Sequence, residues 1–354
     1  MERNLMKGNE ALAEAAVRAG CRHYFGYPIT PQNEIAAYMS KRLPKIGGVF
    51  IQAESEISAI NMVYGCAAAG TRCMTSSSSP GISLKTEGIS YLAGADLPCV
   101  IVNVQRGGPG LGSIQPSQAD YWQATRALGH GDLRIPVLAP STVQEMADMT
   151  GKAFDLADEY RAPVMILADG LLGQMMEPVS FPDIGNADEP RAKAVPKKWA
   201  AVGHGNSRGK NIINSLYLQP EKLEEKITER FKRYEEIKNK HAGAVSENCD
   251  GADIVIAAYG ATARIARSAA ETAREKGIKA GTFRPLTLYP FPEKELREAC
   301  KTAKKVLVAE MSMGQMVDDV KLALECKLPV EFFGRTGGFI PGPGEILNKI
   351  TEVT

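Results

Sequence analysis

Residues 99–110 read CVIVNVQRGGPG, a mainly apolar run that is followed by glutamine, arginine and a glycine-rich turn. A continuous apolar run bounded by turn residues is typical of a strand buried on both faces, as in a parallel sheet. Four further strand-like runs occur between helical patterns in the first half of the chain: HYFGYPIT (23–30), VFIQ (49–52), TRCMTSSSS (71–79) and PVMILADG (163–170). This alternation predicts a mainly parallel α/β sheet with helices packed against it.

The same alternation returns in the last third of the chain. Four more runs there predict a second, smaller parallel α/β sheet: ADIVIAAYG (252–260), AGTFRPLTLYPFP (280–292), KKVLVAEMS (304–312) and VEFFGRTGG (330–338). Between the two regions, residues 177–220 are rich in Pro, Gly, Lys and Asn and show no sustained period, which indicates a connection between lobes.

A charged segment, PEKLEEKITERFKRYEEIKNK (220–240), closes this connection. Its apolar residues recur at three- and four-residue steps, which predicts an amphipathic helix with a charged outer face that begins near Pro220. These residues are Leu223, Ile227, Phe231, Tyr234 and Ile237. We therefore expect one domain over 1–185, a linker with this helix over 186–245, and a second domain over 246–354.

Composition excludes several classes of protein. The 354 residues exceed the roughly 150 of an average domain. The hydrophobic fraction of 44% and charged fraction of 23% are those of a folded globular chain. Because 42 basic residues balance 41 acidic ones, no nucleic-acid partner is expected. No apolar stretch has the length of a signal peptide or membrane span, so we expect a cytoplasmic protein with no membrane partner. The seven cysteines show no C-x-x-C, so no iron–sulfur or zinc site is expected on this chain.

Thr30 lies between Pro28 and Pro31, just after a predicted strand and before a helical pattern. The two prolines fix the backbone there. The threonine can then cap the following helix, or it can aim its hydroxyl outward at the carboxyl end of the sheet, where α/β proteins bind ligands. Both interpretations stay open on this motif alone.

Two glutamates, Glu54 and Glu56, stand at the start of an Ala-rich helical pattern. Acidic residues in that position stabilise the helix dipole, and this structural role competes with binding of a ligand. Arg106, in its glycine-rich turn, has a similar pair of interpretations. Its planar guanidinium can bind the carboxylate of a ligand, or it can pair with a structural carboxylate.

Several familiar motifs are absent from the sequence. The turn Gly107-Gly108-Pro109-Gly110 departs from G-x-G-x-x-G, and no G-x-x-x-x-G-K-[ST] follows any strand. The one G-x-S-x-G, at residues 205–209, lies in the Pro- and Gly-rich connection and not between a strand and a helix, where a nucleophile elbow needs it. No H-E-x-x-H occurs, and the four histidines have no metal spacing. Dinucleotide, triphosphatase, hydrolase and metalloenzyme functions are therefore disfavoured.

Taken together, the motifs resemble the alpha subunit of 2-oxoacid:ferredoxin oxidoreductases, in order and over nearly the whole chain. The matching pieces are GYPITP (26–31), ESE (54–56), QRGGP (105–109), AAYGATAR (257–264), FRPLTLYPFP (283–292), EMSMGQMVDD (310–319) and FFGRTGG (332–338). The resemblance implies a pyrimidine-binding domain with a parallel sheet, followed by a smaller transketolase C-terminal-like α/β domain. It also implies oxidative decarboxylation of a 2-oxoacid to acyl-CoA and CO2, with thiamine diphosphate as cofactor, coenzyme A as co-substrate and ferredoxin as electron acceptor.

The resemblance also assigns roles to residues of this chain. Glu56 corresponds to the family's catalytic glutamate, with Gly65 nine residues later. Its carboxylate would bind N1′ of the aminopyrimidine and favour the tautomer that removes the C2 proton of the cofactor. Thr30 and Arg106 would bind the 2-oxoacid. The segment Tyr27, Pro28 and Ile29 would contact the cofactor, and no metal ligand is expected here.

The resemblance implies partner subunits too. The Gly-Asp-Gly and later Asn that bind diphosphate and Mg²⁺ in this cofactor class are missing; only 131–133 (Gly-Asp-Leu) and 249–251 (Cys-Asp-Gly) come near. A beta subunit would carry the diphosphate and Mg²⁺ site, and ferredoxin-like and gamma subunits would complete the complex, with iron–sulfur clusters on partners only.

The substrate expected from the resemblance depends on the loop GLGSIQPSQADYW (110–122). This loop is similar to the branched-chain members of the family, which favours 3-methyl-2-oxobutanoate. 2-Oxoglutarate comes second, and pyruvate or an aryl pyruvate third. Two other classes remain open: a non-catalytic docking subunit, and a transferase or dehydrogenase component that uses the same cofactor without ferredoxin.

Overall fold

A computed structural model describes residues 3–181 and 197–354 of the chain. Seven of the described strands form one sheet in the order β12-β6-β7-β5-β4-β2-β3, in which only the β12–β6 pair is antiparallel. They are β2 (His23–Gly26), β3 (Val49–Gln52), β4 (Cys73–Ser77), β5 (Cys99–Gln105), β6 (Val137–Leu138), β7 (Pro163–Asp169) and β12 (Thr287–Tyr289). The sheet confirms the predicted α/β class, and a strand forms in each of the five apolar runs.

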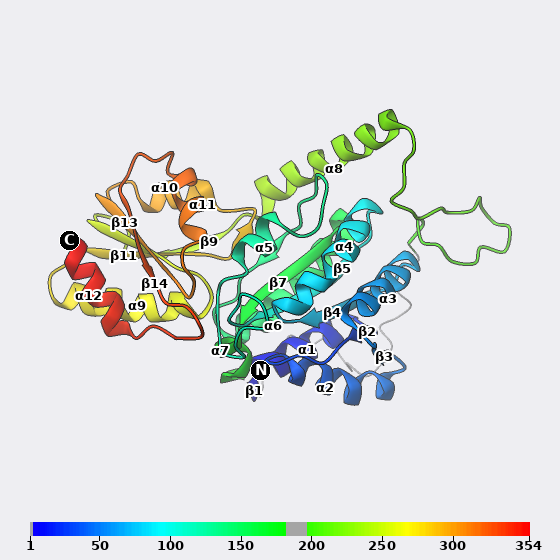
Figure 1. Cartoon of the computed structure of the whole chain (residues 1–354), viewed down its shortest axis with the longest axis horizontal. Coiled ribbons are helices and arrows are strands. Elements are labelled where there is room, and N and C mark those ends of the chain that lie inside the picture. Colours follow the sequence, from blue (N-terminus) through cyan, green and yellow to red (C-terminus); the bar gives the residue numbers. More distant parts are fainter. Residues whose placement is uncertain (1–2, 182–196) are drawn as a thin grey trace.

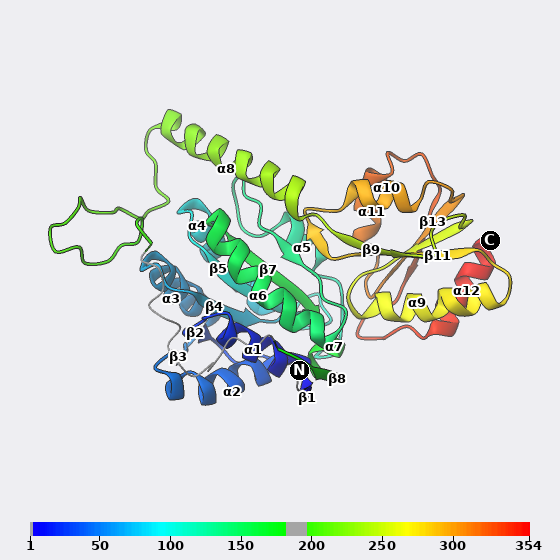
Figure 2. The same cartoon turned by 180° about the vertical axis from the view of Figure 1, so that it is seen from behind.

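Helices cover both faces of this sheet (Figures 1 and 2). Those on one face are α3 (Glu56–Ala68), α4 (Pro80–Gly94) and α5 (Tyr121–Arg126). Those on the other are α1 (Gly8–Arg18), α2 (Asn33–Arg42) and α6 (Val143–Tyr160). Side chains along β5 alternate between the faces, Cys99 and Ile101 toward the first and Val100 and Val102 toward the second. Burial on both faces explains why the first four residues of this strand are all apolar.

A second sheet of five described strands has the order β14-β13-β10-β11-β9, with β9 antiparallel at one edge. Its strands are β9 (Ala244–Glu247), β10 (Ile254–Ala257), β11 (Ala280–Pro285), β13 (Lys305–Glu310) and β14 (Val330–Gly334). Helices α9 (Gly260–Glu275) and α12 (Pro343–Val353) pack on one face, and α10 (Glu293–Ala299) and α11 (Met316–Ala323) on the other. The four predicted strands are present, and β9 adds a fifth.

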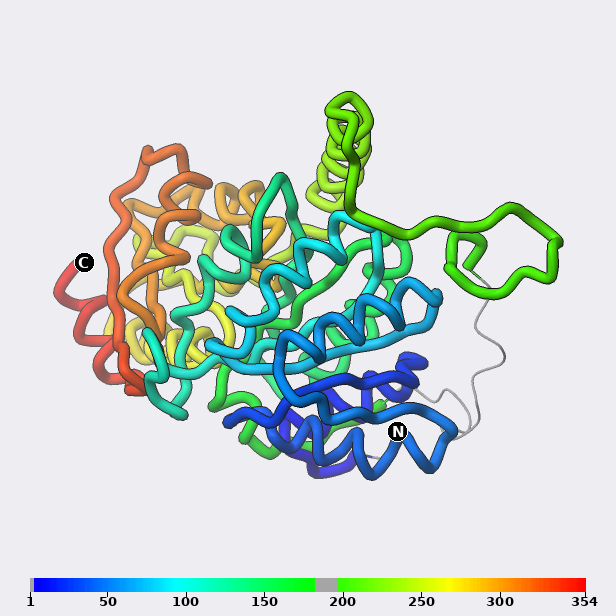
Figure 3. Tube along the Cα trace, turned by 45° about the vertical axis from the view of Figure 1, so that its right-hand side comes forward, coloured from blue at the N-terminus to red at the C-terminus, as the bar shows by residue number. Residues whose placement is uncertain are grey.

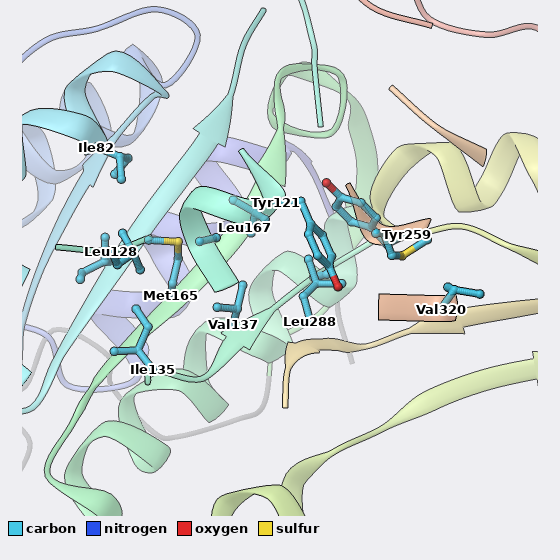
Figure 4. Packing of buried hydrophobic residues seen from close by; sticks show 14 of the residues in the cluster. Ile82, Tyr121, Leu128, Ile135, Val137, Met165, Leu167, Tyr259, Leu288 and Val320 are labelled. Atoms are coloured by element: carbon cyan, nitrogen blue, oxygen red, sulfur yellow. The ribbon is translucent and has the colours of Figure 1, made fainter. Parts of the chain in front are cut away.

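The two sheets share one continuous hydrophobic core. Tyr121 of α5 lies against Tyr259, which directly precedes α9, with ring centroids 5.7 Å apart (Figure 4). Leu288 of β12 and Val320 of α11 belong to the same buried cluster. Because β12 comes from the second half of the sequence yet pairs with the first sheet, it also ties the two halves together. The apolar contacts therefore hold the lobes in a fixed arrangement.

The connection between the lobes contains α8 (Pro220–His241), which begins where Pro220 predicts. Only the C-terminal part of its apolar face is buried: Tyr234 and Ile237 are covered, whereas Leu223 and Phe231 are exposed. The helix extends beyond the body of the molecule, and the chain before it runs clear of the sheet (Figure 3). The expected domain boundary at residues 185 and 186 lies outside the described residues.

Smaller elements complete the described chain. They are β1 (Asn4–Lys7), which pairs with β8 (Met176–Val179), the short helix α7 (Gly170–Gln174) and the 3-10 turn η1 (Pro44–Ile46). No helix in the described ranges is long and apolar enough to cross a membrane.

Candidate active site

The carboxyl ends of four neighbouring strands, β5, β4, β2 and β3, meet at one edge of the first sheet. The loop after β2 carries Thr30, the turn after β3 leads to Glu56, β4 ends in a run of serines, and β5 is followed by Arg106. Parallel strands place their carboxyl ends together, and ligands of open α/β sheets bind at this edge. The sheet order thus brings the three predicted site residues to one place.

Glu56 is the first residue of α3, whose N-cap Ser55 accepts a hydrogen bond from the Ser58 amide at 3.1 Å. Its side chain is 7% exposed, and no residue in the described part of the chain donates a hydrogen bond or forms an ion pair with it. Glu54, by contrast, is exposed. A buried carboxylate with its acceptor sites open costs stability unless a ligand uses them. The geometry therefore favours Glu56 over Glu54 as a ligand-binding residue.

The N-terminus of α4 approaches Glu56 closely because position 81 is glycine. A Cβ on Gly81 would lie 2.7 Å from Oε1 of Glu56 and 2.1 Å from Oγ of Ser77. The hydroxyls of Ser77 and Ser78 are buried and have no hydrogen-bond partner in the described chain. Buried hydroxyls normally find a partner, so these two and the Glu56 carboxylate form a set of unused polar atoms. The set fits a polar heteroaromatic ring such as an aminopyrimidine.

The segment before α2 is open to solvent at its start. Tyr27 and Pro28 are exposed, while Ile29 and Thr30 are partly buried. The N-cap of α2 is Gln32, and Thr30 instead accepts a hydrogen bond from Nδ2 of Asn33 at 3.2 Å. The interpretation of Thr30 as a helix cap is therefore wrong. The hydroxyl of Thr30 lies outside the helix, which begins at Asn33, and its O–H can still donate a hydrogen bond to another group.

Arg106 is 7% exposed and fastens this segment to the glycine-rich loop. Its Nη1 donates to the carbonyl of Thr30 at 3.0 Å, and its Nη2 donates to the carbonyl of Leu111 at 3.2 Å. Its Nε is buried without a partner, and it forms no ion pair within residues 3–181 and 197–354. The alternative of a structural ion pair is thus not supported. The guanidinium keeps its full charge and an unused donor for an anionic ligand.

No sequence motif points to two further polar residues near these groups, Lys85 and Asp120. Lys85 of α4 is fully buried, and its Nζ donates to Oγ1 of Thr75 and to the carbonyl of Ser76. Burial lowers the pKa of Lys85 to about 7, and the nearby Glu56 opposes this shift. Burial also raises the pKa of Asp120, against hydrogen bonds from Ser79 and Asn103 and the charge of Arg106. The sequence offers one signal for the burial of Lys85: it lies four residues after Gly81, on the same face of α4.

The two weak diphosphate-like motifs lie elsewhere. Residues 131–133 form an exposed loop between α5 and β6, and residues 249–251 form a turn between β9 and β10. Neither is at the strand ends that carry Glu56 and Arg106. In the described ranges no three His, Cys, Asp or Glu side chains come close enough to hold a metal ion.

Comparison with known proteins places the chain among relatives of similar length. Residues 14–258 match the family model for pyruvate flavodoxin/ferredoxin oxidoreductase, thiamine diphosphate-binding, and residues 252–346 match pyruvate:ferredoxin oxidoreductase core domain II. The chain is 48% identical to ketoisovalerate oxidoreductase subunit VorB of Methanothermobacter thermautotrophicus, over all of this chain and 98% of that protein. It is 38% identical to 2-oxoglutarate synthase subunit KorA of Methanothermobacter marburgensis, over 99% of this chain and 98% of that one.

A solved structure gives the same result for the fold. 2-Oxoglutarate:ferredoxin oxidoreductase from Magnetococcus marinus, with 2-oxoglutarate, coenzyme A and succinyl-CoA bound, matches with a TM-score of 0.86 at 28% identity. The match covers 99% of this chain and 65% of that one, so this chain spans less than two thirds of its length. The full-length family match, the identity to the curated subunits and this fold agree, and the chain belongs to the 2-oxoacid:ferredoxin oxidoreductase family.

Proposed function

We propose that this chain is the alpha subunit of a thiamine-diphosphate-dependent 2-oxoacid:ferredoxin oxidoreductase that acts on 3-methyl-2-oxobutanoate. The observation that carries the proposal is the buried Glu56 carboxylate, which has no partner in the described chain and faces a strand-end edge that also holds Arg106. Identity of 48% to a ketoisovalerate oxidoreductase subunit supports the family and the substrate class. The cofactor, when bound, supplies the electron sink for decarboxylation.

Glu56 would bind the aminopyrimidine half of thiamine diphosphate. Its carboxyl group would give a proton to the ring nitrogen N1′ and then accept the hydrogen bond of the resulting N1′–H. The partnerless hydroxyls of Ser77 and Ser78 would provide further polar groups for the same ring. Tyr27, Pro28 and Ile29 would form the wall of the same site. The 38% exposure of Tyr27 at that edge leaves its ring accessible to a ligand.

Thr30 and Arg106 would bind the 2-oxoacid. The guanidinium neutralises the carboxylate of the substrate, and the Thr30 hydroxyl, half-buried beside it, donates to the keto or carboxylate oxygen. A unit charge at about 4 Å contributes about 4 kcal/mol at an effective dielectric constant of 20, which is enough to hold and orient an acid. The hydrogen bond from Nη1 to the Thr30 carbonyl places the two residues side by side.

The site would be completed by partner subunits. A beta subunit would hold the diphosphate and its Mg²⁺, and gamma and ferredoxin-like subunits with iron–sulfur clusters would take the electrons while coenzyme A accepts the acyl group. Apolar side chains of the loop after Arg106 support a covering partner, since Leu111 is 86% and Ile114 57% exposed. Such exposed apolar groups beside a binding site are typical of an interface.

The substrate follows from the loop that closes over Arg106. Residues 110–122 contain no second arginine, so the loop offers no cation for the distal carboxylate of 2-oxoglutarate. A branched aliphatic chain needs none. 2-Oxoglutarate remains the second candidate, because the chain is also 38% identical to a 2-oxoglutarate synthase subunit.

The test is to co-express the chain with its neighbouring subunits and to measure coenzyme-A-dependent viologen reduction with a panel of 2-oxoacids. We expect 3-methyl-2-oxobutanoate to give the highest kcat/KM, and the isolated chain to give no turnover. Glu56→Gln should abolish most of the activity, while Glu54→Gln, two residues away and exposed, is the matched control. Full turnover by Glu56→Gln would contradict the proposed role of Glu56. A higher kcat/KM for 2-oxoglutarate would contradict the proposed substrate.

A further inference from the structure

Ser79 has a backbone conformation that a residue with a side chain rarely adopts. It stands between β4 and α4 with φ 24° and ψ −84°, outside the common regions for L-residues. Strained backbone of this kind persists only where surrounding contacts hold it, and it is concentrated at functional sites. Ser79 is also 94% buried, since its exposed fraction is 6%.

The hydroxyl of Ser79 does not cap the helix that it precedes. It occupies the N-cap position of α4, yet it makes no side-chain hydrogen bond to the first turn. Its Oγ lies 2.5 Å from Oδ2 of Asp120, to which it donates, and it accepts the Arg106 amide at 3.0 Å. The Ser79 side chain therefore forms hydrogen bonds with Asp120 and Arg106, which lie in other segments, in place of the usual bond to the first turn of its own helix.

Asp120 joins this hydroxyl to β5. The same Oδ2 accepts a hydrogen bond from Nδ2 of Asn103 at 2.9 Å, and the Asn103 Oδ1 accepts the Ser79 amide at 3.1 Å. The Asp120 amide donates to Oε1 of Gln105 at 3.1 Å. Ser79, Asn103 and Asp120 thus form a closed, largely buried network, which contacts the backbone of Arg106 through the Ser79 hydroxyl. Such a network rigidifies the residues it encloses when its members are satisfied.

We propose that Ser79 and Asp120 are positioning residues that fix the backbone of Arg106, so that its guanidinium is held ready for the carboxylate of the 2-oxoacid. The inference depends on the substrate-binding role of Arg106 in the proposed function. The network holds the Arg106 amide from one side, and the carbonyls of Thr30 and Leu111 hold the guanidinium from the other. A displacement of about 1 Å at a group that orients a substrate lowers efficiency severely.

The test uses the assembled complex and steady-state kinetics with the preferred 2-oxoacid. Ser79→Gly removes the hydroxyl while glycine tolerates the positive φ. We expect KM for the 2-oxoacid to rise about 10-fold with kcat within about 2-fold, because the lost contact acts on binding of the substrate. Relief of the strained backbone opposes the loss of the hydrogen bond to Asp120, so calorimetry should show a melting temperature within a few degrees of that of the native complex. Asp120→Asn should raise KM in the same direction, and it provides a second variant should Ser79→Gly fail to assemble.

Ser90→Ala is the matched control. Ser90 is another buried serine of α4, and its hydroxyl donates to the His130 carbonyl at 2.7 Å, away from Arg106. Its loss should lower the melting temperature without changing KM. A general packing defect in α4 would give this same pattern for Ser79→Gly.

A double-mutant cycle separates the inference from the proposed function. Ser79→Gly should change KM by less than about 2-fold in an Arg106→Lys background, since both changes act on one guanidinium. Two results would overturn the positioning role alone. One is that Ser79→Gly and Arg106→Lys raise KM additively in the double variant. The other is that Arg106→Lys raises KM while Ser79→Gly and Asp120→Asn leave it unchanged. An unchanged KM in Arg106→Lys would overturn the substrate-binding role of Arg106 and the positioning role with it.

Discussion

Two buried glutamates at strand ends, Glu56 and Glu310, differ in what surrounds their carboxylates. Glu310 ends β13 and is fully buried. Its oxygens accept hydrogen bonds of 2.9–3.2 Å from Oγ of Ser312 and from the backbone amides at the start of α11. Glu56 is also nearly buried and also stands at a helix N-terminus, but within the described chain no group donates to it.

The contrast separates a structural carboxylate from an available one. At Glu310, burial raises the pKa and the amides of Met316, Gln315 and Val317 with Ser312 oppose that rise, so the charge is held by the protein itself. At Glu56 the carboxylate has no donor within the described residues, and it shares the close approach of Gly81 with the partnerless hydroxyl of Ser77. The first carboxylate stabilises the fold, and the second can act on a ligand. The same substitution at both positions should therefore have opposite consequences.

The largest effect is expected for Glu56→Gln. Coenzyme-A-dependent turnover of the complex should fall about 100- to 1,000-fold, because the carboxylate that exchanges a proton with the cofactor is lost. The melting temperature should stay within a few degrees of the native value, since no hydrogen bond inside the described chain is broken. Kinetics and calorimetry on the same preparation check both statements. A large fall in melting temperature would show that Glu56 is structural, like Glu310.

Glu310→Gln should show the reverse pattern. Its amide group would turn donors toward the backbone amides of α11, which leaves buried donors unpaired and lowers the free energy of unfolding by about 2–4 kcal/mol. Turnover of the folded complex should be unchanged. Denaturant unfolding followed by circular dichroism measures the loss. Unchanged stability would mean that the amides of α11 do not need this carboxylate.

Arg106→Lys should have a smaller effect on catalysis than Glu56→Gln. Lysine keeps the charge, but it cannot reach the carbonyls of Thr30 and Leu111 with a planar fork. We expect KM for the 2-oxoacid to rise about 10- to 100-fold and kcat to fall less. An equal loss of kcat and kcat/KM would instead mean that the arginine interacts with the substrate only in the transition state.

Taken over one pH unit, the smallest effect is a pH dependence at Lys85, near Glu56. Burial lowers the pKa of Lys85 to about 7 in the folded chain, against about 10.4 in the unfolded chain. Between these values the unfolded state binds more protons, so stability rises with pH by up to about 1.4 kcal/mol per unit and is lowest below pH 7. Lys85→Met should lack this slope, and its stability advantage over the native chain should shrink from pH 7 to pH 10. Unfolding curves across that range provide the test, and parallel slopes would contradict it.

The sequence predicts the elements whose signal is local. The apolar run of β5 and the proline-bounded start of α8 appear where the pattern predicts them, and the order of motifs indicates that Glu56, Arg106 and Thr30 share a strand-end edge. By contrast, β12 pairs with β6 across about 150 residues of sequence, and both are two or three residues long, too short for a periodic signal.

The rest of the site depends on tertiary contacts that no local pattern contains. The serine run 76–79 spans the end of β4 and the turn before α4, and its residue types cannot reveal that Ser79 takes a positive φ. Asp120 lies 14 positions after Arg106 in an irregular segment, and only the fold brings its carboxylate under that loop. From the sequence, Lys85 is an ordinary charged residue of a helix, whereas in the fold the packing of α3 and α4 buries it. Motifs thus identify the residues that meet a ligand better than the residues that hold them.

The proposed function requires the open carboxylate of Glu56 to act on thiamine diphosphate bound between this chain and its partner. The decisive test is exchange of the cofactor's C2 proton for deuterium in the assembled complex, followed by quenched-flow NMR in the absence of 2-oxoacid. We expect exchange to be slowed about 100-fold or more in Glu56→Gln and to be unchanged in Glu54→Gln. Native exchange in Glu56→Gln, with the cofactor still bound, would contradict it.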